Sequence, residues 1–106
     1  MKSLKTVMTI AFLSGVAVAY AAEQTITSKG KVFSMTDVTL KKGATLNFVN
    51  DDNIVHNVMS TSAGNEFNVG AVKPGISTPV TFKSAGDVKV ICAIHPSMKM
   101  LVKVVD

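Results

Sequence analysis

Three side chains that bind soft metals stand within seven residues near the end of the chain. They are the thiol of Cys92, the imidazole of His95 and the thioether of Met98, and Cys92 is the only cysteine. A second histidine, His56, lies 36 residues before Cys92. Sulfur and imidazole donors select copper rather than calcium or magnesium, and one Cys, two His and a weak axial Met form a blue-copper electron-transfer site. The residue types therefore predict a copper site built from two separate segments.

Each of these residues also has an explanation without metal. Cys92 fits a small buried apolar side chain at a strand end, and a single histidine at a strand end is commonly satisfied by hydrogen bonds. However, an odd cysteine in an exported protein needs a reason, because such cysteines normally pair as disulfides. Cys92, His56 and His95 taken together favour the metal site.

Two methionines compete for the axial position. Met98 lies six residues after the cysteine and Met100 lies eight after it. With Met98 as the ligand, Val102 and Val104 fall on the inward positions of the last strand. With Met100, the register shifts by two and Asp106 reaches an inward position, where an unpaired carboxylate is costly. The pattern favours Met98 and keeps Met100 as the alternative.

The elements that must position these residues are β-strands. Short runs rich in Val, Ile, Thr and Phe recur every eight to twelve residues and are separated by Gly, Asn, Asp, Ser and Pro. We expect strands at 24–28, 31–35, 38–41, 45–50, 54–60, 78–83, 88–92 and 101–105, and 67–69 is a candidate for a further short strand. The pattern predicts an all-β fold, a Greek-key β-sandwich of seven to eight strands, with Cys92 leaving the buried side of its strand.

The first 21 residues have the pattern of a signal peptide. Lys2 and Lys5 precede an apolar run, and Ala19 and Ala21 occupy the positions that a signal peptidase reads. We expect cleavage after Ala21, a single copper-binding domain over residues 22–106, and no membrane insertion after cleavage. An uncleaved membrane anchor is the alternative, although the apolar run is short for a span.

The charge of the expected mature chain argues against a nucleic-acid partner. Removing Lys2 and Lys5 from the eleven basic residues leaves nine lysines against seven acids, so the net charge falls from +4 to +2. The chain has no arginine and its lysines are scattered. The clustered basic patch of nucleic-acid-binding proteins is therefore missing from the sequence.

Two motifs give the chain a family resemblance. Residues 43–51 lead into His56-Asn57-Val58, and Gly86-Asp87 precedes the Cys92–Met98 segment. In this order and spacing the chain resembles the cupredoxins, the small type 1 copper proteins, over about residues 25–105. Within that family it resembles the plastocyanin, pseudoazurin and amicyanin group, and the short Cys-x-x-His-Pro-x-Met loop resembles amicyanin most.

The resemblance implies a role for each site residue. One copper per chain would be held by His56, Cys92, His95 and the axial methionine. Asn57 would tie the two ligand loops together, and the alternative is an ordinary polar residue of an edge strand. Electrons would leave through a partly exposed His95, surrounded by an apolar docking face that includes Pro96 and some of Met35, Met59 and Met98.

We therefore expect a monomeric, periplasmic one-electron carrier. The resemblance implies redox proteins as partners, namely a c-type cytochrome and an amine dehydrogenase. A periplasmic copper chaperone or storage protein is the alternative and would favour exposed ligands and Cu(I). A metal-free structural sandwich domain is the third possibility. An enzyme is disfavoured, because four protein ligands leave no open position for a substrate.

Overall fold

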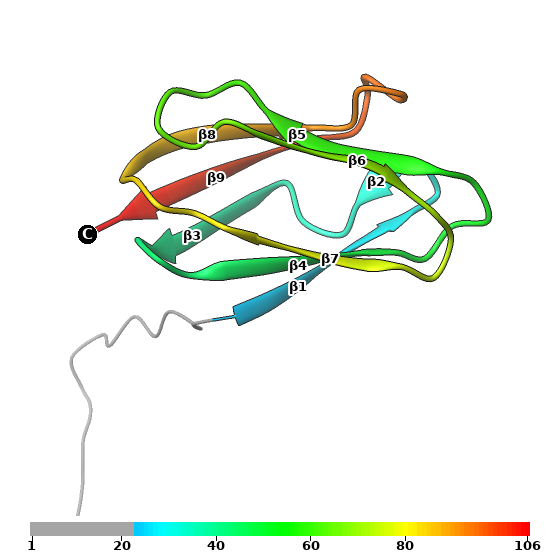
Figure 1. Cartoon of the computed structure of the whole chain (residues 1–106), viewed down its shortest axis with the longest axis horizontal. Coiled ribbons are helices and arrows are strands. Elements are labelled where there is room, and N and C mark those ends of the chain that lie inside the picture. Colours follow the sequence, from blue (N-terminus) through cyan, green and yellow to red (C-terminus); the bar gives the residue numbers. More distant parts are fainter. Residues whose placement is uncertain (1–22) are drawn as a thin grey trace, which may run out of the picture.

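Nine β-strands in two stacked sheets make up the described part of the chain, residues 23–106, in the computed structural model (Figure 1). No helix that could cross a membrane occurs among these residues. The all-β prediction is thus confirmed. The expected signal peptide, residues 1–21, lies outside the described residues.

The first sheet contains four strands in the order β2-β1-β4-β7, and the second contains five in the order β3-β9-β8-β5-β6. The strands of the first sheet are β1 (Glu23–Lys29), β2 (Val32–Phe33), β4 (Thr45–Asn50) and β7 (Ser77–Thr81). Those of the second are β3 (Asp37–Lys41), β5 (His56–Ser60), β6 (Phe67–Val72), β8 (Gly86–Ile91) and β9 (Lys99–Val105). The chain crosses between the sheets several times, and β1 runs parallel to β4 and β3 parallel to β9.

The core lies between the two sheets. It is formed mainly by every second side chain of the strands, because successive side chains of a strand point to opposite faces. In β4, Leu46 and Phe48 point inward and are at most 1% exposed, while Asn47 is half-buried on the other face. In β9, Val102 and Val104 point inward and Lys103 outward. Each fully buried side chain of this size contributes about 1.5–3 kcal/mol to folding. This burial stabilises the two-sheet scaffold from which the ligand loops extend.

Several strand boundaries differ from the sequence prediction. The strand count is nine rather than seven to eight, and the strand expected at 31–35 is shortened to the two residues of β2, which pairs with β1. The strand expected at 54–60 begins only at His56, since the side chain of Asn50 donates a hydrogen bond to the carbonyl of Ile54 and holds that residue in the preceding turn. The strand expected at 67–69 extends to Val72 through a glycine.

Candidate metal centre

The two histidines and the cysteine meet at one end of the sandwich. His56 is the first residue of β5, Cys92 directly follows β8, and His95 lies in the β8–β9 connection, drawn in orange at the right of Figure 1. β5 and β8 are neighbours in one sheet, paired at Met59 and Ile91. Because adjacent antiparallel strands bring the start of one beside the end of the next, His56 and Cys92 come together.

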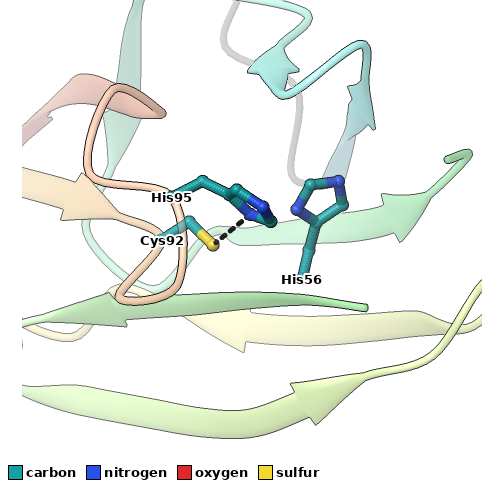
Figure 2. A group of neighbouring side chains, drawn as sticks. All are labelled: His56, Cys92 and His95. Atoms are coloured by element: carbon teal, nitrogen blue, oxygen red, sulfur yellow. Dashed lines mark hydrogen bonds between the residues drawn. The ribbon is translucent and has the colours of Figure 1, made fainter. Parts of the chain in front are cut away.

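The donor atoms of His56, Cys92 and His95 all lie within 4.8 Å of one another (Figure 2). Nδ1 of His95 is 3.9 Å from Sγ of Cys92, and the centroids of the two imidazole rings are 5.0 Å apart. Ligands that share one metal ion must lie this close, because metal–nitrogen and metal–sulfur bonds are only about 2.0–2.3 Å long. The three residues that sequence spacing predicted are therefore brought together as a group that could hold a metal.

The buried histidine supplies a direct test of whether a metal fits. His56 is 1% exposed, and its Nδ1 is buried without a hydrogen-bond partner among residues 23–106. In Figure 2 one ring nitrogen of His56 is turned toward Cys92 and His95. A buried polar atom without a partner costs about 1–3 kcal/mol. A soft metal bound between these three donors would remove that cost, so the residues fit a copper ion.

The other ring nitrogen of His56 contacts a carboxylate. Nε2 lies 2.7 Å from Oδ2 of Asp52, whose side chain is 15% exposed. The hydrogen bond from His56, together with those from the backbone amides of Gly30 and Lys31, lowers the pKa of Asp52 to about 2. Asp52 is therefore ionised at neutral pH and accepts the Nε2 proton of His56.

Asn57 connects the two ligand segments. Its Oδ1 accepts the backbone amide of Ala93 at 3.1 Å, and its own backbone amide donates to Sγ of Cys92 at 3.3 Å. Its Nδ2 donates to Asn68 and to the carbonyl of Gly70, each at 2.9 Å. The residue is 5% exposed. These contacts match the bridging position that the family resemblance implies for Asn57.

A bulge in β6 makes this connection possible. Two residues of β6, Val69 and Gly70, stand opposite the single Val58 of β5, and Gly70 has a φ of 77°. Glycine adopts this left-handed conformation without the steric cost that a Cβ would bring. The bulge turns the Gly70 carbonyl toward the Asn57 amide.

The connection between β8 and β9 is closed by its own backbone. The amide of Cys92 donates to the carbonyl of Met98 at 3.1 Å, and the amide of Met98 donates to that of His95 at 2.9 Å. Met98 is 1% exposed and faces the core level with Cys92. Met100 is also buried, but it pairs with Val90. Both axial candidates therefore point inward, and Met100 lies two residues farther along the strand.

The expected docking face is only partly present. Ile94 is 52% exposed and Met35 is 42% exposed, and Pro96 is exposed beside half-buried His95. Of the three methionines considered for this face, Met98 is buried in the core and Met59 is half-buried.

Sequence reasoning missed two polar residues of the site. Asn50 is 1% exposed, and its side chain donates to the carbonyls of Ile54 and Val72 and accepts the amide of Asp52. Asp52 holds His56, as described above. The only sequence signal was the polar run from Asn50 to Asn53, which indicates a turn but not its contact with a histidine.

Comparisons with known proteins agree with this geometry. The family described as "Copper binding proteins, plastocyanin/azurin family" matches residues 20–105. No curated protein sequence matches the chain at a significant level.

Solved structures share the fold at low identity. A purple cupredoxin from Nitrosopumilus maritimus is 24% identical with a TM-score of 0.67, and the match covers 76% of this chain and 98% of that one. A variant of amicyanin in its Cu(I) form is 19% identical with a TM-score of 0.73, with 82% and 86% covered. The copper-containing nitrite reductase of Thermus scotoductus is 23% identical with a TM-score of 0.73, with 90% of this chain but 25% of that chain covered.

The family match spans nearly all of the described residues, and within them the fold brings two histidines and a cysteine together. The chain therefore belongs to the plastocyanin/azurin family of copper-binding, electron-transfer proteins, the cupredoxins, and its cofactor is copper.

Proposed function

We propose that the chain is a soluble one-electron carrier of the periplasm whose copper is held by His56, Cys92, His95 and Met98. The observation that carries the proposal is the convergence of three donor atoms within 4.8 Å, with Nδ1 of His56 buried and unpartnered. When bound, copper supplies the one-electron couple between Cu(I) and Cu(II). The chain supplies a site that is fixed before any metal binds.

Rigidity of the ligands is the main contribution of the protein. The side chain of Asn57 ties the start of β5 to the loop after Cys92, and Asn50 ties the turn before β5 to β6. Ligands held in this way change position little between two oxidation states. A small change in ligand positions means a small reorganisation energy, and a small reorganisation energy favours fast electron transfer.

Burial of the donors favours a carrier over a chaperone or storage protein. Cys92 is fully buried and Met98 is 1% exposed. A protein that passes copper to a partner needs ligands that the partner can reach. We therefore place the hypothesis of a copper chaperone or storage protein second.

The half-buried His95 supplies an exit for electrons. Its sequence neighbours Ile94 and Pro96 are exposed and apolar, and His95 is the one predicted ligand that is not fully buried. An apolar patch of this kind fits brief contact with another protein. We propose a c-type cytochrome as acceptor and an amine dehydrogenase as donor, and a protein that works as a monomer.

Strand register supports Met98 as the axial ligand. Val90 and Met100 are paired, so Met100 lies two residues along the strand from the level of Cys92. Two residues of a β-strand correspond to about 6.6 Å. Met98 is bonded through its backbone carbonyl to Cys92 itself.

Substitution of each methionine distinguishes the two. Met98→Leu should weaken Cu(II) relative to Cu(I) about tenfold, which raises the reduction potential by about 59 mV, and it should change the EPR spectrum. Met100→Leu conserves volume in the core and should cost less than about 1.5 kcal/mol with the spectrum unchanged. The reverse pattern would make Met100 the ligand.

The primary test is copper loading of the mature protein. Addition of Cu(II) should give an intense visible absorption band and an EPR spectrum with narrow copper hyperfine splitting. The reduced protein should then be oxidised by a c-type cytochrome in a stopped-flow experiment. A colourless protein that binds only Cu(I) would contradict the carrier and favour the chaperone.

Export has a separate test. Expression of the full chain in a bacterium with an intact secretion pathway should give a periplasmic protein whose N-terminus is Ala22. Retention of residues 1–21 in the membrane fraction would contradict periplasmic release.

A further inference from the structure

The carboxylate of Asp52 is held in place from three sides. Its Oδ1 accepts the backbone amide of Gly30 at 2.8 Å, and its Oδ2 accepts the amide of Lys31 at 3.1 Å and contacts Nε2 of His56 at 2.7 Å. The amide of Asp52 itself donates to Oδ1 of Asn50 at 2.9 Å. A surface carboxylate without such contacts would be free to rotate, so this one is fixed relative to the His56 ring.

The contact determines which nitrogen of His56 carries the proton. An ionised carboxylate only accepts hydrogen bonds, so Nε2 must be protonated. In the neutral ring, Nδ1 then presents a lone pair. That atom is buried and has no partner among the described residues. The orientation needed for metal binding is therefore set before the metal arrives.

The contact also places a full negative charge one imidazole ring away from the donor cluster. Asp52 is 15% exposed, so water screens its charge only in part. Its neighbour Asp51 carries the same charge but points away, toward Lys29 at 3.7 Å, with 60% of its side chain exposed. A nearby negative charge stabilises the more positive oxidation state of a metal. Asp52 should therefore favour Cu(II) over Cu(I).

We infer that Asp52 is a positioning residue that orients His56 toward copper and lowers the reduction potential of the site. Through Asp52 the β1–β2 turn, at Gly30 and Lys31, becomes part of the support of the centre. The electrochemical half of this inference rests on the proposed function. The half that concerns the His56 proton does not, because it holds for the protein without copper.

The test of the charge compares Asp52→Asn with Asp51→Asn. Both remove one negative charge from neighbouring positions, but only Asp52 contacts His56. Partners of metal-bound histidines commonly change metal affinity by 10–100-fold. Asp52→Asn should weaken Cu(II) relative to Cu(I) about tenfold, equivalent to a rise of about 59 mV in reduction potential for a one-electron couple. Asp51→Asn should move the potential by less than a third of that.

Voltammetry of both copper-loaded variants measures these shifts. The asparagine oxygen can still accept the Nε2 proton, so a raised potential reports the charge rather than a lost orientation. Equal potentials in the two variants would overturn the charge role of Asp52. If the wild-type protein gave no type 1 spectrum, the proposed function would fail instead, and the two failures are therefore distinct.

Nitrogen NMR of the wild-type protein without copper tests the orientation. Long-range proton–nitrogen correlations, recorded where the ring is neutral, should show His56 protonated at Nε2 and not at Nδ1. A proton on Nδ1 would overturn the positioning role. This measurement needs no variant, so it decides the question even if Asp52→Asn does not fold.

Discussion

Replacing Cys92 by Ser should abolish the intense visible absorption of the copper-loaded protein and weaken Cu(II) binding by more than about 100-fold, beyond the effect usual for residues behind the ligands. The absorption requires a thiolate donor, whereas a serine hydroxyl is a neutral, hard donor that copper sites of this kind do not use. Cys92 is fully buried among the core residues at the end of β8. Absorption, EPR and a copper titration measure the loss.

The loss of absorption and of copper binding in Cys92→Ser has to be distinguished from a loss of folded protein. Serine is close to cysteine in volume, and the backbone bond from Cys92 to Met98 is retained, so the copper-free variant should keep its circular dichroism. Ser97→Ala, at an exposed position of the same connection, is the matched control and should keep the full absorption. Persistence of the band in Cys92→Ser would exclude a cysteine-ligated centre.

The strands that supply the ligands could be predicted because their burial alternates. Val88 and Val90 of β8 and Val102 and Val104 of β9 point inward as their period-2 spacing predicts. The same periodicity favours Met98 only through the position of Asp106, because Met98, just before β9, and Met100, within it, are both buried. Only the register of β8 against β9 distinguishes their levels.

The course of β6 could not be predicted for a different reason. Gly70 follows the strand pattern of residues 67–69 and indicates the end of a strand. In the structure it forms a bulge instead, and the strand continues to Val72. A glycine in a strand pattern is compatible with either outcome. Which one occurs depends on Asn57, a partner 13 residues away in the sequence.

The Asp52–His56 contact depends on tertiary structure in the same way. The run from Asn50 to Asn53 indicates a turn from its residue types alone. Whether a side chain of that turn reaches His56 depends on how the β1–β2 turn packs, since the amides of Gly30 and Lys31 hold the carboxylate. No pattern within four residues of the histidine carries that information.

Asn57 is the residue outside the ligand set whose removal should affect both the stability of the fold and copper binding most. Asn57→Ala should lower the free energy of unfolding of the copper-free protein by about 2 kcal/mol, since three side-chain hydrogen bonds are lost at about 0.5–1.5 kcal/mol each. For a domain of this size the melting temperature should fall by roughly 8–16 °C. Denaturant and thermal unfolding of the copper-free protein measure both quantities.

Copper binding should weaken in the Asn57→Ala variant as well, by about 10–100-fold, because the loop after Cys92 loses its tie to β5 at the amide of Ala93. The backbone amide that donates to Sγ of Cys92 remains in the variant, so the change reports the side chain alone. Asn53→Ala, an exposed asparagine of the adjoining turn, is the control and should change stability by less than about 0.5 kcal/mol. If both variants bound copper equally well, the sheet and the backbone amide of residue 57 would be enough to hold the two ligand segments together, and the Asn57 side chain would be dispensable to the site.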